Sequence, residues 1–248
     1  MNDEWLLRYQ RQLLLPGVGV PGQQRLERAH VVLIGLGGLG CASAGYLAGA
    51  GVGRISLIDN DRVESANLHR QLLFRQADIG QLKCDAAAAT LRQLNPDVEL
   101  QALSERATPD NLDHLLASAD LVLDGSDNFA TRYAINRACL ARSIPLVSAS
   151  AIGLRGQVMM LAGHLPDSPC YACVYPSDTK AADENCSNAA VLGPAVGLAG
   201  TLQAARALQW LLELPGAEPG VLWQIDLSRH SPRAVTLSKD PVCPECHH

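Results

Sequence analysis

The chain has 248 residues and a formal net charge of −5, and its hydrophobic fraction of 48% includes only three Trp, five Tyr and two Phe. This length suits one large domain, and an apolar content carried by aliphatic residues is typical of helix-rich α/β proteins. The acidic balance argues against broad binding to nucleic acids or anionic membranes, which needs a basic face. Because the N-terminus is acidic and no apolar run approaches about 18 residues, we expect a cytoplasmic protein without a secretory or membrane-spanning segment.

The first predicted elements form a β-α-β unit. Residues 31–34 are a short, apolar, β-branched run that ends at a glycine, as a buried parallel strand does. An Ala- and Leu-rich helix is predicted over 41–50, and a second strand over 54–59 ends on an acidic residue. These elements have the size expected of such a unit.

Helices and strands continue to alternate along the chain. Helices are predicted over 81–94, 109–118 and 132–142, and strands over 98–103, 121–124 and 145–148. A β-like stretch begins at 156, residues 166–193 read as a loop, a helix covers 194–214, and an antiparallel pair is predicted over 221–227 and 233–237. The pattern predicts an α/β, Rossmann-like, doubly wound and mostly parallel sheet with C-terminal antiparallel strands.

A glycine-rich turn follows the first predicted strand. Gly35, Gly37 and Gly40 have the G-x-G-x-x-G spacing between strand and helix, and Asp59 ends the next strand, where a ribose-binding carboxylate is expected. The alternative is that some of these glycines only allow close helix-strand packing. The motif therefore indicates a nucleotide site but not which nucleotide.

Two basic residues favour a triphosphate. Arg70 and Lys83 follow Asp59, and an enzyme that cleaves a triphosphate needs fixed cations to offset charge on the α-phosphate and on departing pyrophosphate. Arginine offers a planar fork and lysine a mobile point charge, so the two can serve different phosphates. Taken alone, each is more often a solvated surface charge.

Asp127 follows the predicted strand 121–124, at the edge of the sheet where ligands bind in such folds. A carboxylate there can hold Mg²⁺ between phosphates. The alternative role is an N-cap for the helix that follows.

The cysteines divide into two kinds. Two C-x-x-C pairs supply the four soft ligands of a closed, structural Zn²⁺ site, in preference to a redox dithiol: Cys170, Cys173, Cys243 and Cys246. In contrast, Cys41, Cys84 and Cys139 lie in Ala-rich helical contexts and are predicted to be buried.

Taken together, residues 8–12, 35–40, 67–71 and 124–128 and the two cysteine pairs resemble the MoeB/ThiF family, the bacterial relatives of ubiquitin-activating enzymes. The resemblance runs in the same order over essentially the whole chain. It implies an ATP-dependent adenylyltransferase that joins AMP to the C-terminal glycine of a ubiquitin-like sulfur-carrier protein ending in Gly-Gly and releases pyrophosphate. The product would serve thiocarboxylate formation in molybdopterin or thiamine biosynthesis, with sulfur from an external donor.

The resemblance also implies residue roles. Asp59 would hold the ribose, Asp127 would bind Mg²⁺, and Arg11 would reach the active site of the neighbouring subunit in a homodimer. The other implied contacts to ATP and its phosphates come from Gly38, Gly40, Asn67, Arg70, Gln71, Lys83 and Asn128. His69 stands where the family usually carries Gln, so we expect somewhat different contacts to the phosphates with the function retained.

Cys186 matches a loop cysteine that some family members join to the carrier through an acyl-disulfide; the alternative is an ordinary exposed thiol. We expect one domain over 1–248, with a nucleotide-binding half (1–165) and a zinc- and carrier-binding half (166–248). The competing interpretation is an NAD-dependent oxidoreductase with a structural zinc, which leaves Arg70, Lys83 and Asp127 unexplained.

Overall fold

The computed structural model describes residues 2–176, 190–229 and 232–246. Its helices are α1 (Asp3–Leu13), α2 (Gly19–Arg28), α3 (Gly38–Ala50), α4 (Lys83–Leu94), α5 (Pro109–Leu115), α6 (Phe129–Ala141), α7 (Tyr171–Val174) and α8 (Gly193–Leu211), with short 3-10 turns η1 (Ser65–Asn67) and η2 (Gln76–Asp78). Its strands are β1 (His30–Ile34), β2 (Arg54–Ile58), β3 (Glu99–Leu103), β4 (Leu121–Asp124), β5 (Leu146–Ile152), β6 (Arg155–Leu161), β7 (Val221–Asp226) and β8 (Arg233–Thr236). Among the described helices, none is long and apolar enough to cross a membrane.

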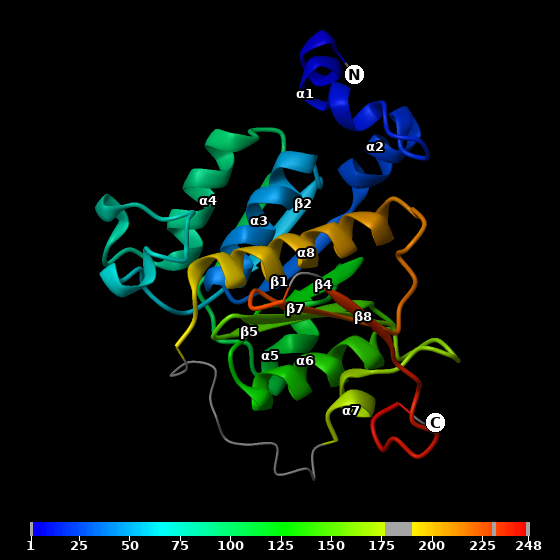
Figure 1. Ribbon diagram of the computed structural model, residues 1–248. Coiled ribbons are helices and arrows are strands. Elements are labelled where there is room, and N and C mark those ends of the chain that lie inside the picture. Colours follow the sequence, from blue (N-terminus) through cyan, green and yellow to red (C-terminus); the bar gives the residue numbers. More distant parts are fainter. Residues whose placement is uncertain (1, 177–189, 230–231, 247–248) are drawn as a thin grey trace.

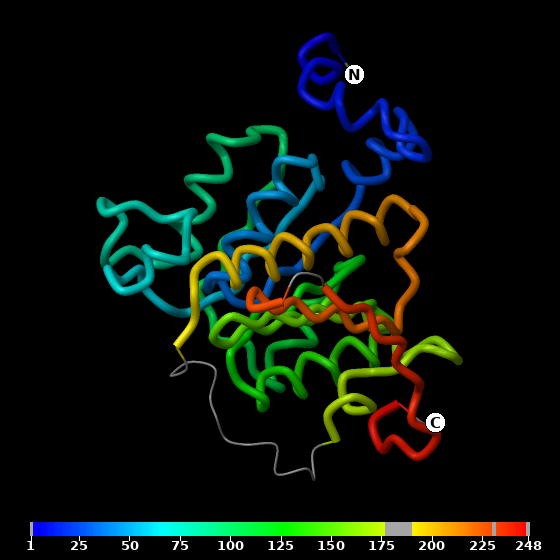
Figure 2. Tube along the Cα trace, in the orientation of Figure 1, coloured from blue at the N-terminus to red at the C-terminus, as the bar shows by residue number. Residues whose placement is uncertain are grey.

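The strands form one sheet in the order β3-β2-β1-β4-β5-β6-β7-β8. The pairs from β3 to β5 are parallel, and those from β5 to β8 are antiparallel. Figure 2 traces this path, with the red C-terminal strands beside the green ones. The predicted fold class, including its C-terminal antiparallel strands, is confirmed.

Helices cover both faces of the sheet and bury two apolar clusters (Figure 1). On one face, Leu47 of α3, Leu91 of α4 and Ala204 of α8 belong to the larger cluster. On the other face, Leu112 of α5 and Ile135 of α6 belong to the second cluster. Both faces of the parallel strands are therefore apolar, which is why those strands read as continuous hydrophobic runs in the sequence.

Several differences from the predicted elements lie at helix starts. Helix α3 begins at Gly38 rather than 41, and α6 begins at Phe129 because the Asn128 side chain accepts a hydrogen bond from Thr131 N at 2.9 Å. Helices α1 and α2 precede the first strand, where no element was predicted, and the short α7 interrupts the predicted loop. The predicted burial of Cys41, Cys84 and Cys139 is confirmed.

Helix α8 packs closely on α3 and ties it to the sheet. Ser43 Oγ of α3 donates to Gln203 Oε1 of α8 at 2.8 Å, and Gln203 Nε2 donates to the Asp124 and Val147 carbonyl oxygens, each at 2.9 Å. A Cβ on Gly200 would lie 2.4 Å from the Leu39 carbonyl oxygen, so only glycine fits there. This contact places the start of α3 beside the end of β4.

Two glycines of α8 give a matched test of this packing. We expect Gly200→Ala to lower the free energy of unfolding by about 1–3 kcal/mol, because the new methyl group meets backbone that cannot yield easily. Gly197→Ala lies on the same helix with open space where a Cβ would stand, so we expect it to stabilise by roughly 0.5–1 kcal/mol through helix propensity. Denaturant melts of both variants measure the difference. Equal effects of the two substitutions would contradict the close α3–α8 contact.

Candidate nucleotide pocket and metal centre

A cavity of about 880 Å³ opens at the carboxyl ends of the parallel strands, where the strand order reverses between β1 and β4. Ligands of doubly wound sheets bind at such a switch point. The cavity brings together most of the predicted nucleotide residues, namely Gly38, Asp59, Asn67, Arg70, Gln71, Lys83, Asp127 and Asn128.

The glycine-rich turn shapes the floor of this cavity. Gly35 has φ of 91°, and its Cβ would lie 2.9 Å from the Gly125 carbonyl oxygen of the loop after β4. A Cβ on Gly40 would lie 1.9 Å from the Gly35 carbonyl oxygen. Gly40 is not among the residues that line the cavity. The packing interpretation therefore applies to Gly40, which lets α3 start close to the strand.

Asp59 is held in place by the backbone around it. Leu36 N donates to Asp59 Oδ2 at 2.6 Å, and Asp61 N donates to Asp59 Oδ1 at 2.8 Å. These bonds fix the carboxylate between the glycine turn and the segment after β2. Each carboxylate oxygen has a second lone pair, so Asp59 can still accept from two vicinal hydroxyls of a ribose.

Lys83 is a buried cation at the start of α4. Its side chain is 7% exposed, and its Nζ lies 2.9 Å from Asp61 Oδ2. The N-terminus of a helix disfavours positive charge, so Lys83 depends on a nearby anion. Asp61 was missed by the sequence analysis. The available signal was a second acidic residue two positions after Asp59, at the same edge of the sheet.

Arg70 is oriented by two acceptors. Its Nη1 donates to the Ala66 carbonyl oxygen at 3.0 Å and to His69 Nε2 at 2.8 Å. His69, the departure noted in the sequence, thus accepts from Arg70, which requires an unprotonated Nε2. Asn67 Oδ1 accepts from Glu64 N at 3.3 Å and closes the η1 turn.

Gln71 offers a buried acceptor at the same cavity. The residue is 3% exposed, and its Oε1 has no hydrogen-bond partner among the described residues. Leaving a buried polar atom without a partner is costly, so a donor group on a ligand would bind there favourably.

The two residues after Ser126 divide their roles. Asn128 caps α6, and its Nδ2 donates to Asp127 Oδ1 at 3.2 Å. The N-cap alternative for Asp127 is therefore wrong, because Asn128 fills that position. Asp127 instead lines the cavity, where its carboxylate suits a hard cation such as Mg²⁺.

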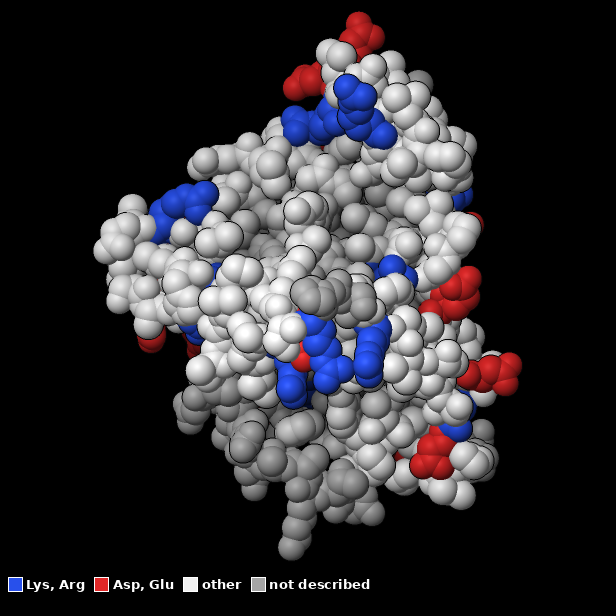
Figure 3. Space-filling view, in the orientation of Figure 1, with Lys and Arg blue, Asp and Glu red and all other residues white. Residues whose placement is uncertain are grey.

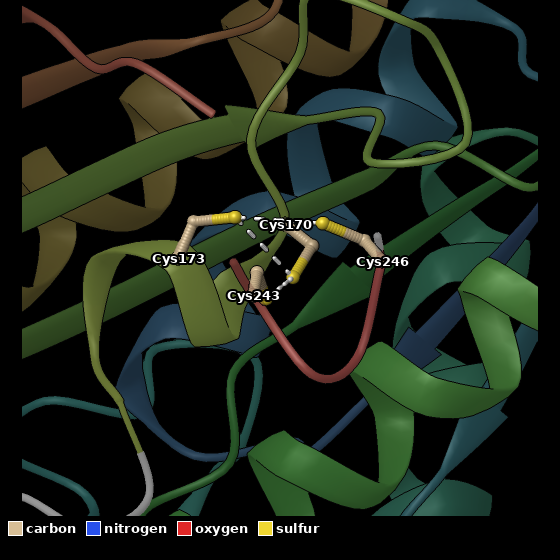
Figure 4. Close-up of side chains that lie close together, drawn as sticks. All are labelled: Cys170, Cys173, Cys243 and Cys246. Carbon is tan, nitrogen blue, oxygen red and sulfur yellow. Dashed lines mark hydrogen bonds between the residues drawn. The ribbon is translucent and has the colours of Figure 1, made fainter. Parts of the chain in front are cut away.

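The four cysteines of the two C-x-x-C pairs form one cluster, in which all four Sγ atoms lie within 4.8 Å of one another (Figure 4). Cys170 and Cys243 Sγ lie 3.7 Å apart, and Cys173 and Cys246 Sγ lie 3.5 Å apart. These separations are far longer than a disulfide bond, and a tetrahedron with Zn–S bonds of about 2.3 Å has edges of about 3.8 Å. The cluster therefore fits a closed structural Zn²⁺ site.

An ion pair joins the second cysteine pair to α6 independently of any metal. Arg137 Nη1 of α6 lies 3.0 Å from Glu245 Oε1, and Glu245 stands between Cys243 and Cys246.

Burial raises the pKa of the Cys170 thiol to about 11, so a bound cation is needed to keep this ligand as a thiolate.

The remaining predicted site residues lie elsewhere. Arg11 is exposed on α1 and does not line the cavity; Figure 3 shows a group of basic side chains over α1, at the top of the view. Arg8, on the same helix, donates to the Leu94 carbonyl oxygen at 3.1 Å. Cys186 lies outside the described residues.

The cluster makes a direct prediction about metal content. We expect close to one zinc per chain, and we expect Cys243→Ser to lose most of it, because three thiolates leave the tetrahedron incomplete. Cys139→Ala is the matched control, since Cys139 is buried in the second apolar cluster, away from the four sulfurs. Metal analysis of purified protein measures both. Full zinc content in Cys243→Ser would contradict the four-thiolate site.

Comparison with known proteins agrees with this geometry. The chain is 45% identical over 248 residues to the protein named "Sulfur carrier protein ThiS adenylyltransferase" from Escherichia coli K12, covering 99% of this chain and 97% of that protein. It is 43% identical to the pig protein named "Adenylyltransferase and sulfurtransferase MOCS3", but it spans only 54% of that longer protein.

Among solved structures, the fold is similar to Escherichia coli MccB with ATP, with a TM-score of 0.84 and 25% identity over 99% of this chain and 75% of that chain. It is also similar to MccB with MccA-N7isoASN, with a TM-score of 0.86 and 24% identity over 100% of this chain and 76% of that chain. The second likeness concerns the fold alone. The pattern of the ThiF family matches residues 9–245, which include the glycine turn, the switch-point cavity and all but one residue of the paired cysteines. With that match and the near full-length bacterial relative, the chain belongs to the ThiF family.

Proposed function

We propose that this protein is an ATP-dependent adenylyltransferase that activates the C-terminal glycine carboxylate of a ubiquitin-like sulfur-carrier protein. The observation that carries the proposal is the gathering of Arg70, Lys83 and Asp127 around one switch-point cavity. The printed name of the bacterial relative, which this chain covers almost completely, describes the same activity. The oxidoreductase alternative gives those three residues no role.

The reaction is an in-line displacement. A carboxylate oxygen of the carrier attacks the α-phosphorus of ATP, forming the acyl-adenylate bond while the bond to the bridging oxygen breaks and pyrophosphate leaves with its electrons. Both reactants are anions, so the protein chiefly offsets repulsion and fixes the geometry of attack. No side-chain nucleophile is required.

The cavity residues divide these tasks. We assign the ribose to Asp59 and the phosphates to Asn67, Arg70, Gln71 and Lys83. Lys83 would leave Asp61 in part, or share its three donors, when phosphate oxygens arrive. Asp127, with Asn128 beside it, would hold Mg²⁺, which neutralises charge on the phosphate oxygens when bound.

Several finer points belong to the same proposal. The carrier ends in Gly-Gly and is MoaD- or ThiS-like, and the thiocarboxylate serves molybdopterin or thiamine biosynthesis. The chain spans about half the length of the MOCS3 relatives. We propose that the sulfur comes from an external donor. A cytoplasmic location suits four thiolates that must stay reduced. The two halves, 1–165 and 166–248, would serve nucleotide and carrier.

Pyrophosphate exchange tests the site. With a panel of Gly-Gly-ending carriers, we expect the cognate carrier to support exchange, and we expect Arg70→Ala and Asp127→Ala each to reduce it by about 100-fold or more, because charge stabilisation is lost at the reacting phosphates. Arg92→Ala is the matched arginine control, because Arg92 is exposed and does not line the cavity. Exchange near the wild-type rate in Arg70→Ala or Asp127→Ala would contradict the assignment of these residues to the ATP site.

We also propose that the protein is a homodimer in which Arg11 completes the partner's site. Neither Arg11→Ala nor Arg70→Ala alone should support exchange. After subunits of the two variants are mixed and re-equilibrated, half of the dimers have one complete site of two, so about a quarter of wild-type activity should return. Activity that stays absent in a mixture with proven subunit exchange would exclude a role in trans.

For Cys186 we propose that the external donor first transfers a sulfane sulfur to it, and that the resulting persulfide attacks the carrier acyl-adenylate, displaces AMP and leaves carrier and Cys186 joined by an acyl-disulfide. The expected result is a carrier adduct that is sensitive to reductant, visible by mass spectrometry with wild type and absent with Cys186→Ser. Carrier adducts at Cys41 or Cys84 should not appear, since burial raises the pKa of both thiols to about 12. An undiminished adduct in Cys186→Ser would remove Cys186 from the mechanism.

A further inference from the structure

A buried arginine lies beneath the loop that carries Asp127. Arg132, in the first turn of α6, is 6% exposed. Its Nη2 donates to the Ser126 carbonyl oxygen at 2.6 Å and to the Ala149 carbonyl oxygen of β5 at 3.0 Å. The guanidinium therefore holds the backbone immediately before Asp127 against the neighbouring strand.

The same loop is held on its other side by a buried carboxylate. Asp124, the last residue of β4, is fully buried, and its Oδ1 accepts from Ser126 N at 2.9 Å and from Ser126 Oγ at 2.6 Å. Its Oδ2 accepts from Ser148 Oγ at 3.0 Å. Ser126 is thus fixed through its amide, hydroxyl and carbonyl groups, which leaves Asp127 little freedom in where it points.

The rest of α6 is anchored away from the cavity. Tyr171, which directly follows Cys170, is 1% exposed, and its backbone N donates to Asn136 Oδ1 of α6 at 2.8 Å. Arg137 Nη1 of α6 lies 3.0 Å from Glu245 Oε1. The helix that carries Arg132 is therefore held at its middle as well as at its first turn.

We propose that Arg132 is a positioning residue for the Mg²⁺-binding carboxylate of Asp127. The inference rests on the assignment of Asp127 to Mg²⁺ in the proposed function. Mg²⁺ demands near-ideal octahedral geometry, so a small displacement of its carboxylate weakens binding. The adenosine end of the nucleotide, held by Asp59 on the far side of the glycine turn, does not share this dependence.

The experiment measures binding rather than turnover. A non-hydrolysable ATP analogue is titrated by calorimetry at a series of Mg²⁺ concentrations, and adenosine is titrated as an internal reference. We expect Arg132→Lys, which keeps the charge but loses the fork, to raise the half-saturating Mg²⁺ concentration by about tenfold or more, with adenosine affinity unchanged. Ser126→Ala, which removes the hydroxyl that Asp124 holds, should give a smaller rise in the same direction.

Arg137→Lys is the matched control. Arg137 lies on the same helix, but its side chain is 53% exposed and lies 3.0 Å from Glu245 Oε1, away from the loop that carries Asp127. Its Mg²⁺ dependence should equal that of wild type. Circular dichroism and adenosine binding verify the fold of each variant, and Ser126→Ala carries the test if Arg132→Lys does not fold.

The outcomes separate the positioning role from the proposed function. Wild-type Mg²⁺ dependence in folded Arg132→Lys, or in Ser126→Ala where Arg132→Lys does not fold, overturns the positioning role. A wild-type protein that binds adenosine but never the triphosphate analogue overturns the proposed function instead.

Discussion

The arrangement of the nucleotide pocket depends on how closely three backbone segments approach one another at the switch point. Gly35 and Gly40 have backbone carbonyl groups in the space that a side chain would fill, and a Cβ on Gly125 would lie in ordinary contact with both, 3.4 Å from Gly35 O and 3.5 Å from Gly40 N. This contact brings the start of α3 and the ends of β1 and β4 together. Asp59 from β2 and Asp127 from the loop after β4 then line one cavity instead of two separate edges.

Around that contact, the charged groups are fixed before a ligand arrives. Lys83 is aimed by Asp61, Arg70 is aimed by Ala66 and His69, and the loop before Asp127 is held by Asp124 and Arg132. Groups oriented in advance need not reorganise as charge shifts in the reaction, which is the main source of electrostatic catalysis. The fold thus orients these groups before a nucleotide binds.

Sequence reasoning recovered what short spacing encodes and missed what only the fold brings together. The parallel strands, the glycine turn and the cysteine pairs could be predicted because each is a local pattern with one physical reading. The assignments to single residues could not, since they depend on which neighbour fills a position in three dimensions: the pairing of Asp61 with Lys83, the packing role of Gly40 and the cap at Asn128. The roles of the buried Asp124 and Arg132 in holding the loop could not be predicted, because an acidic residue at a strand end and an arginine in a helix are ordinary in sequence. Helices α1 and α2 lie before the first strand, outside the alternating pattern from which the other helices were predicted.

The cysteine cluster also has a consequence for synthesis of the chain. Cys170 and Cys243 are 73 residues apart in sequence, so the first pair emerges well before its partners exist. At about 5–20 residues per second, that interval lasts roughly 4–15 s. During this time Cys170 and Cys173 are an exposed dithiol with metal-binding spacing but half a site. Cellular reductants and zinc-buffering capacity, rather than the fold alone, therefore decide whether the nascent pair survives to meet its second half.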